Sequence, residues 1–198
     1  MILRRIFQAR TSGFYVDVGA YHPKHLSNTY YFYRRGWRGI NIDAMPGSME
    51  LFRQLRARDI NIEAAIAADE RECTFYIFNG RALNTLDAQL AAERVDGETR
   101  VVEKRKVKTR RLVDILNESL PVGEHIQFMS IDVEGLDLEV LTSNDWTRFR
   151  PEYIVVEIWD LDVTRHESHP LVTYLAQQDY TLVGKAYSTA FFKDTLHG

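Results

Sequence analysis

The amino-acid sequence predicts an α/β fold with a mostly parallel sheet that carries helices on both of its faces. Short apolar runs alternate with amphipathic segments along almost the whole chain, and that alternation is typical of strands joined by crossover helices. The 198 residues are 45% hydrophobic and 27% charged, so they can bury one core of ordinary size. No repeat or linker divides the chain, which predicts a single domain over residues 1–198 with its core at about residues 13–193.

The first third of the chain predicts a β-α-β-α-β unit. Its apolar runs are rich in β-branched and aromatic residues, and Met49, Phe52 and Leu55 recur at helical spacing in the second helix. Ser27 is a candidate N-cap for the first helix, and Gly36 is suited to end it. In order, the expected elements are a strand over residues 13–19, a helix over 28–35, a strand over 37–43, a helix over 48–58 and a strand over 60–65.

Two strand-like segments in the middle of the chain differ from this pattern. They cover residues 73–78 and 100–109, and the polar stretch 79–97 between them has room for a short helix. We expect the pair to form an antiparallel addition at the edge of the sheet, where charged side chains discourage pairing with a second molecule.

Regular alternation returns in the last part of the chain. The run of residues 153–159 is strongly apolar and follows Pro151, as a buried strand would. The expected elements are a helix over residues 112–120, a strand over 126–132, a helix over 136–141, a strand over 153–159, a helix over 170–178, and a closing hairpin of strands over 180–185 and 189–193.

Acidic residues end four of the predicted strands. Asp17 ends the first strand, Asp43 the second, and Asp132 and Glu157 two later ones. Ligands of an open parallel sheet bind outside the carboxyl ends of the strands, near the point where the strand order reverses. Because a half-buried carboxylate normally has a partner or a task, this pattern predicts a ligand site at that edge of the sheet.

The spacing of the first two strand ends indicates the kind of ligand. Asp43 lies 24 residues after Gly19, close to the spacing at which an acid binds ribose hydroxyls in a Rossmann-type unit. Tyr21, His22 and Pro23 occupy the place of the further glycines that a pyrophosphate needs. A cofactor with a ribose and no phosphate fits better, and S-adenosylmethionine is the common one. The alternatives are an NAD-dependent oxidoreductase and a cofactor-binding module without turnover.

Three stretches of the chain resemble the FkbM-type methyltransferases. They are residues 14–20 (FYVDVGA), 36–43 (GWRGINID) and 131–135 (IDVEG), and the resemblance extends over about residues 13–193. It implies a Rossmann-like class I methyltransferase fold with a seven-stranded sheet, and S-adenosylmethionine as the cofactor. Residues 22–23 and 27–30 look like members associated with bacterial surface-polysaccharide pathways, which implies a sugar or glycan as the methyl acceptor and O-methylation as the reaction.

The resemblance also implies the residues that bind the cofactor. Asp43 would bind the ribose, although the family often has the longer Glu at this position. Asp132 would lie near the sulfonium or the amino group. The remaining expected cofactor residues are Gly19 and Ala20 at the methionine part, Asp17 and Asn28 at the loop that follows, and Ala65 and Ile66 at the adenine.

A sugar hydroxyl is a poor nucleophile at neutral pH and gains from a general base. The candidate catalytic residues lie on loops above the strand ends: His22, Asp132, Glu134, Glu157 and His166. Several of these residues also have a purely structural interpretation. Glu134 could cap the helix that follows it, His22 could bind the next turn, and His166 and its neighbour His169 could be solvated loop residues. Carboxylate oxygens suit Mg²⁺, so Mg²⁺ is a possible second cofactor, but it is not favoured because no third ligand lies close in sequence to Asp132 and Glu134.

Residues 100–111 carry seven basic side chains. They predict either a solvated edge strand or a patch for an anionic acceptor, such as a sugar nucleotide or an acidic glycan. The net charge of −3 and the lack of interleaved aromatic residues in the run argue against nucleic acid. Trp146 and Trp159 are interpreted as packing residues. A lone cysteine, Cys73, and the absence of a long apolar segment predict a cytoplasmic protein without a membrane span.

Overall fold

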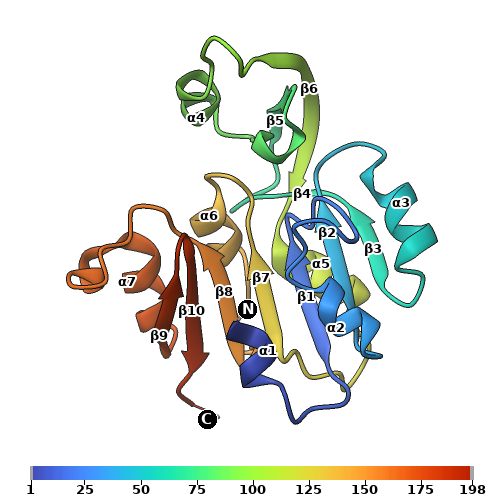
Figure 1. The fold of residues 1–198 in the computed structure, drawn as a ribbon, viewed down its shortest axis with the longest axis vertical. Coiled ribbons are helices and arrows are strands. Elements are labelled where there is room, and N and C mark those ends of the chain that lie inside the picture. Colours follow the sequence, from blue (N-terminus) through green and yellow to red (C-terminus); the bar gives the residue numbers. More distant parts are fainter. Residues whose placement is uncertain (1, 197–198) are drawn as a thin grey trace.

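The computed structural model describes residues 2–196, apart from the side chain of Arg81, and it contains a seven-stranded sheet in the order β3-β2-β1-β7-β8-β10-β9 (Figure 1). Neighbouring strands run parallel, except that β10 is antiparallel to both of its neighbours. The predicted fold class is confirmed. Met1 and residues 197–198 of the predicted domain lie outside the described residues. The strands are β1 Phe14–Val18, β2 Arg38–Asp43, β3 Ile60–Glu63, β7 Phe128–Ile131, β8 Tyr153–Glu157, β9 Tyr180–Ala186 and β10 Thr189–Asp194.

The strand order reverses at β1. The chain adds β2 and β3 on one side of β1, and it returns through β7 and β8 on the other side. The connections that leave β1 and β7 therefore diverge, and they open a crevice at the carboxyl ends of these two strands.

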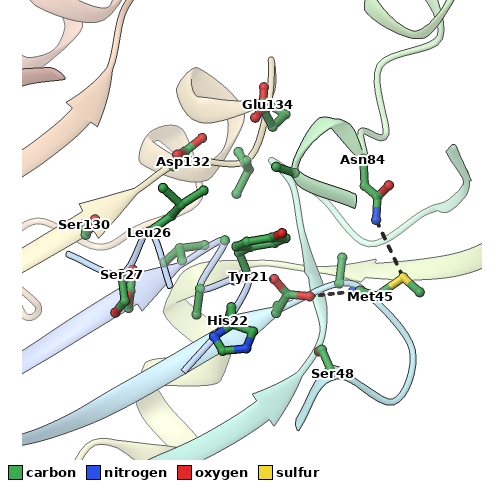
Figure 2. Close-up of a pocket in the computed structure, with 18 of the residues that line it drawn as sticks. Tyr21, His22, Leu26, Ser27, Met45, Ser48, Asn84, Ser130, Asp132 and Glu134 are labelled. Carbon is green, nitrogen blue, oxygen red and sulfur yellow. Dashed lines mark hydrogen bonds between the residues drawn. The ribbon is translucent and has the colours of Figure 1, made fainter. Parts of the chain in front are cut away.

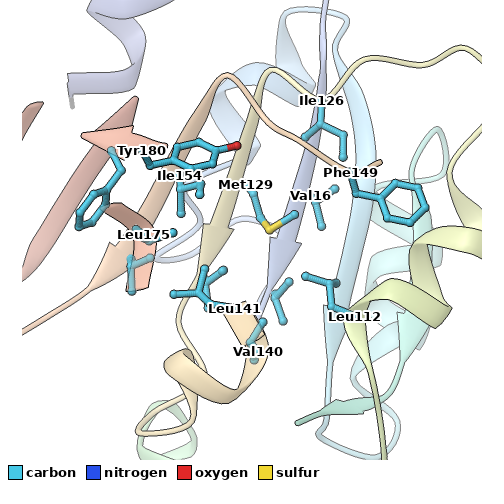
Figure 3. Packing of buried hydrophobic residues seen from close by; sticks show 14 of the residues in the cluster. Val16, Leu112, Ile126, Met129, Val140, Leu141, Phe149, Ile154, Leu175 and Tyr180 are labelled. Carbon is cyan, nitrogen blue, oxygen red and sulfur yellow. The ribbon is translucent and has the colours of Figure 1, made fainter. Parts of the chain in front are cut away.

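One face of the sheet is covered by α5 Leu112–Ser119, α6 Asp137–Thr142 and α7 Pro170–Gln177. Alternate strand residues point to this side, since successive side chains of a strand lie on opposite faces. Figure 3 shows Val16, Met129 and Ile154 of the sheet packed with Leu141 and other helix residues. All four side chains are fully buried, and each stabilises the fold by about 1.5–3 kcal/mol relative to an exposed position.

The opposite face carries α1 Ile2–Ile6 and α2 Tyr30–Arg34. Phe7, Phe32, Trp37 and Phe128 form its aromatic core, with ring centroids 4.8–6.2 Å apart. The five-residue helix α1 was not predicted, because so short a segment shows no helical period of apolar residues. The predicted cap Ser27 lies two residues too early: its Oγ accepts from the amides of residues 29 and 30 in the turn before α2.

Residues 72–110 form a separate unit, hereafter the outer unit, that stands beyond the carboxyl ends of the parallel strands (Figure 1). It contains β5 Glu72–Phe78, the 3-10 turn η1 Arg81–Leu83, α4 Ala88–Glu93 and β6 Val101–Arg110. The predicted antiparallel pairing of β5 with β6 is confirmed. The pair does not extend the large sheet, because β6 pairs instead with the short strand β4 Ala65–Ile66 in a three-stranded sheet.

Two further elements complete the fold, α3 Ser48–Leu55 and the 3-10 turn η2 His166–Ser168. α3 packs Met49 and Phe52 against Ala20, just past the end of β1. No helix of the described residues has the length and apolar character needed to cross a membrane.

Candidate functional site

A cavity of about 750 Å³ lies over the carboxyl ends of β1, β2, β7 and β8. The outer unit contributes Phe75 and Asn84 to its wall. Figure 2 shows Asp132 and Glu134 on one side of this space, and Met45 and Asn84 on the other. Ten of the predicted site residues line the cavity: Asp17, Gly19, Ala20, His22, Asn28, Asp43, Ile66, Asp132, Glu134 and Glu157.

Gly19 allows β1 and β7 to approach closely at the floor of the cavity. Its φ is +82°, which residues other than glycine rarely adopt, and a Cβ atom there would lie 1.7 Å from the carbonyl oxygen of Asp132. The amides of Gly19 and Ala20 both donate to the carbonyl of Ile42, at 2.9 and 3.0 Å. The floor is therefore narrow, rigid and made of small residues.

Asp43 fastens the two loops beside it. Its Oδ2 accepts from the amide of Tyr21 and its Oδ1 from the amide of Met45, both at 2.8 Å. Burial raises the pKa of Asp43, and the two amides oppose that rise. Each carboxylate oxygen keeps a second lone pair, so Asp43 can also accept hydrogen bonds from the two hydroxyls of a ribose.

These features fit an adenosyl cofactor. The acid at the end of β2 faces the cavity, Gly19 and Ala20 leave room beside it, and Ile66 adds an apolar wall. Tyr21 follows Ala20 with a φ of +54° and an exposed side chain, where a dinucleotide site has a glycine. The cavity thus offers a ribose acceptor without a phosphate loop.

A buried network of hydrogen bonds and one ion pair, which the sequence did not predict, holds the loop of residues 20–29 beside the cavity. Arg56 and Asp59 are fully buried and form an ion pair at 2.8 Å. Arg56 also donates to the carbonyl of Pro23 at 2.9 Å and to Thr29 Oγ1 at 3.0 Å. Thr29 Oγ1 in turn donates to Asp17 at 2.7 Å. The predicted role of Asp17 in holding this loop remains a prediction, and Arg56 supplies the anchor.

Three carboxylates from the ends of β7 and β8 lie together. One oxygen from each of Asp132, Glu134 and Glu157 lies within 4.8 Å of the others. Burial, and then the charges of Glu157 and Glu134, raise the pKa of Asp132 to about 8. At neutral pH Asp132 therefore carries a proton, and it loses that proton in the range suited to a general base.

The outer unit holds Glu134 in place. Arg94, at the end of α4, forms an ion pair with the Glu134 carboxylate, and both side chains are about four-fifths buried. Thr85 Oγ1 donates to the carbonyl of Glu134 at 2.6 Å. Glu134 has a φ of +55°, a strained conformation that these two contacts stabilise. Glu134 does not cap the following helix, because Leu136 occupies the N-cap and the carboxylate is bound to Arg94.

Glu157 is the third acid of the cluster. It is distant from Asp132 in the sequence and comes close because its strand, β8, is paired with β7. Its Oε1 accepts from Ser188 Oγ at 2.8 Å. The three carboxylates have the oxygen ligands that Mg²⁺ prefers. Two of the three already have a protein partner, Arg94 for Glu134 and Ser188 for Glu157.

His22 lines the cavity, but its ring serves the loop. Its Nδ1 accepts from the amides of Lys24 and His25, both at 3.0 Å. Burial and its basic neighbours lower the pKa of His22, so the ring is neutral near pH 7. A neutral ring whose Nδ1 accepts carries its proton on Nε2, and it can donate to a ligand but cannot take a proton from one. This geometry matches the loop interpretation of His22.

Two predicted site residues lie outside the cavity. His166 is in η2, and its Nδ1 contacts the carbonyl of Val163 at 2.9 Å, so the long connection after β8 carries it away from the strand ends. Ala65 is buried in β4, whereas its neighbours Ala64 and Ile66 line the cavity, because alternate residues of an extended chain face opposite ways.

Six of the seven residues of the basic run lie on the outer unit, Arg111 is the N-cap of α5, and none of the seven lines the cavity. Five of them form ion pairs with acidic residues: Arg105 with Glu103, Lys106 with Glu72, Lys108 with Glu70, Arg110 with Glu118 and Arg111 with Asp114. The run is thus a solvated strand with balanced charge, and it gives no support to an anionic acceptor.

The two tryptophans have different environments. Trp146 is 6% exposed, as a packing residue is expected to be. The packing interpretation of Trp159 is wrong: it is 63% exposed and lines the cavity. The cause is that β8 ends at Glu157 rather than at residue 159, so Trp159 lies past the last paired residue of the strand.

Comparison with known proteins gives one finding. A family model described as the methyltransferase FkbM domain matches residues 17–182. No curated protein and no solved structure matches the chain.

Proposed function

Because the chain belongs to the FkbM methyltransferase family and is therefore a methyltransferase, we propose that it transfers a methyl group from S-adenosylmethionine to a hydroxyl oxygen of a sugar or glycan. We place this reaction in the assembly of a bacterial surface polysaccharide or a related glycan, as the residues 22–23 and 27–30 suggest.

The position of Asp43 is the observation that carries the cofactor proposal. A buried carboxylate at the end of β2 faces a cavity whose floor is made of Gly19 and Ala20. We assign Asp43 to the ribose, Gly19 and Ala20 to the methionine part, and Ile66 to the adenine. When bound, S-adenosylmethionine would supply a methyl group on a sulfonium, and S-adenosylhomocysteine would be the leaving group when a nucleophilic oxygen takes that methyl group.

Asp132 is our candidate for the general base. In this role a carboxylate oxygen of Asp132 would take the proton of the acceptor hydroxyl as that hydroxyl oxygen displaces S-adenosylhomocysteine from the methyl carbon. The pKa of Asp132, near 8, is raised by burial and by the charges of Glu157 and Glu134, and it matches that task at mildly basic pH. Glu134 and Glu157 are candidates to accept hydrogen bonds from neighbouring hydroxyls of the acceptor. Most of the acceleration then comes from the alignment of the reacting atoms.

Calorimetric titration tests the cofactor directly. We expect S-adenosylhomocysteine, the product form, to bind the protein with micromolar or better affinity, and NAD to show no binding at the same concentrations. Binding of NAD in place of S-adenosylhomocysteine would contradict the proposal. A cofactor-binding module would bind S-adenosylhomocysteine and yet transfer no labelled methyl group from S-adenosylmethionine to any glycan acceptor.

A further inference from the structure

We propose that Trp159 and Tyr187 form a platform on which a pyranose ring of the acceptor lies, an inference that rests on the proposed transfer to a sugar hydroxyl. Trp159 lines the cavity and is 63% exposed, and Tyr187 is 85% exposed. Their ring centroids are 5.2 Å apart with the planes at 79°. Exposure of two large aromatic side chains costs hydrophobic free energy, so this pair at a cavity mouth indicates a surface that a ligand covers.

The turn between β9 and β10 builds this platform. Tyr187 and Ser188 are the two residues of the hairpin loop, and Tyr187 has a φ of +56°. Asn, Asp or Gly normally occupies such a position because a larger side chain is strained there. The turn is also bound to the end of β8, where the amide of Ile158 donates to the carbonyl of Ser188 at 2.6 Å.

The same turn places a hydrogen-bond acceptor beside the aromatic rings. Ser188 Oγ donates to Glu157 Oε1 at 2.8 Å, and Glu157 lies two residues before Trp159 in the chain. Thr189, which follows the turn, lines the cavity as well. One two-residue loop thus fixes an apolar surface, a carboxylate and a hydroxyl at a single edge of the cavity.

A pyranose matches this combination of surfaces. Its ring presents C–H groups on one face and several hydroxyls around the rim. That face can stack on Trp159 while Tyr187, whose plane is at 79° to the indole, meets the edge of the pyranose and the hydroxyls donate to carboxylates. Asp132, Glu134 and Glu157 together offer more acceptor sites than the single hydroxyl of a phenol could use. The platform stands on the β8 side of the cavity, and β7 and β1 separate it from Asp43 at the end of β2, which leaves the adenosyl side free.

Quenching of tryptophan fluorescence by acrylamide tests the platform. The chain has three tryptophans, and Trp37 and Trp146 are 1% and 6% exposed, so acrylamide quenches mainly Trp159. The ligands to test are methyl pyranosides of the gluco, galacto, manno and rhamno series, each added with saturating S-adenosylhomocysteine. We expect at least one of them to protect Trp159 from acrylamide quenching in a saturable way. Trp159→Phe should abolish this response and leave the calorimetric affinity for S-adenosylhomocysteine unchanged.

Tyr187→Gly tests the second ring with Trp159 still present as the reporter. Glycine suits the φ of +56°, so this variant should melt no lower than the wild type and yet bind the protecting pyranoside about two- to tenfold more weakly. Asp179→Gly is the matched control, because Asp179 has a φ of +60°, precedes β9 and does not line the cavity. It should leave pyranoside affinity unchanged.

Three results would overturn the platform. One is protection of Trp159 by pyranosides no stronger than that by glycerol, and another is equal pyranoside affinity of the wild type and Tyr187→Gly. The third is protection by catechol and by none of the pyranosides, which would assign the platform to an aromatic acceptor. Failure of the wild type to bind S-adenosylhomocysteine would contradict the proposed function and not the platform. In that case a pyranoside titration in the absence of S-adenosylhomocysteine would still test the platform.

Discussion

Individual carboxylates set the chemistry of the cavity through the partners that each one has. Asp43 is held by two backbone amides, Glu134 by Arg94 and Glu157 by Ser188. No described residue donates a hydrogen bond to the side chain of Asp132. Burial and the neighbouring acids raise the pKa of Asp132 into the physiological range. Of these four acids, one is therefore a candidate proton acceptor, and the other three are held in place by protein partners.

Asp43→Ala tests the ribose assignment at the scale of one residue. Loss of the hydrogen bonds to a charged acceptor should weaken S-adenosylhomocysteine binding by about 1–3 kcal/mol in calorimetry. Glu63→Ala is the matched control, since Glu63 ends the neighbouring strand and accepts from the amide of Gly47 at 2.8 Å but does not line the cavity. Equal losses in the two variants would reduce the role of Asp43 to fastening a loop.

The raised pKa of Asp132 has a consequence for stability. A folded-state pKa of about 8, against a usual value near 4, means that the folded protein keeps a proton that the unfolded chain releases. Unfolding free energy therefore falls as pH rises from about 4 to about 8 and is independent of this group above that range, with a maximum slope of about 1.4 kcal/mol per pH unit. Melting temperatures should thus fall from pH 6 to pH 8 more steeply in the wild type than in Asp132→Asn, and parallel curves would contradict the assigned protonation.

Asp132 should also shape the pH dependence of transfer. The carboxylate becomes free as pH rises through about 8, so kcat/KM for the acceptor should rise to a plateau above that pH. In Asp132→Asn the rate should be lower at every pH, and this rise should disappear.

At the scale of elements, the loop of residues 20–29 depends on a side chain from the end of α3. Arg56 spans from Asp59 to the loop through Pro23 and Thr29, and its side chain is completely buried. Such an ion pair is strongly stabilising only while both partners are present, because a lone buried charge is costly. The loop, the end of α3 and the start of β3 are thus coupled through one guanidinium.

Arg56→Met should destabilise the protein by about 3–5 kcal/mol in chemical denaturation, because Asp59 is left buried without a counter-charge. Arg58→Met, two residues away on the exposed surface, should change the unfolding free energy by less than about 0.5 kcal/mol. Combining Arg56→Met with Asp59→Leu should recover part of the loss. A loss in Arg56→Met as small as that in Arg58→Met would show that the network contributes little.

Elements with a clear period were predictable, and contacts between distant elements were not. The strand ends at Asp17, Asp43, Asp132 and Glu157 follow from alternation along the chain, which the structure confirms for the sheet. Arg56 and Arg94 carry no local signal, because their burial arises only when loops from other parts of the chain fold over them. Trp159 was placed in a strand since its apolar run continues past the last pair of β8, and hydrophobicity cannot tell a buried aromatic residue from a ligand-facing one.

At the scale of the whole molecule, the net charge of −3 conceals charges that are balanced locally. The acids and bases of the outer unit pair with one another along β6. In the cavity, Arg94 and the proton on Asp132 compensate two of the three clustered carboxylates. We therefore expect methyl transfer not to depend on a divalent cation.

Chelation tests this balance. Methyl transfer measured after dialysis against EDTA should equal that of untreated protein, and added Mg²⁺ should not change it. Activity that EDTA abolishes and Mg²⁺ restores would instead assign an ion to Asp132, Glu134 and Glu157.

The pairing of β1 with β7 joins parts of the chain that are far apart. Tyr15 is paired with Phe128 at the amino ends of the two strands, and the Phe14 amide is bound to the side chain of Gln127, 113 residues further on. Pairings of such long range form late, since the closure of a large loop must precede them. A nascent chain that has not yet emerged beyond β7 therefore has no cavity at all, and the appearance of ligand binding during synthesis or refolding marks the moment at which the two halves of the sheet meet.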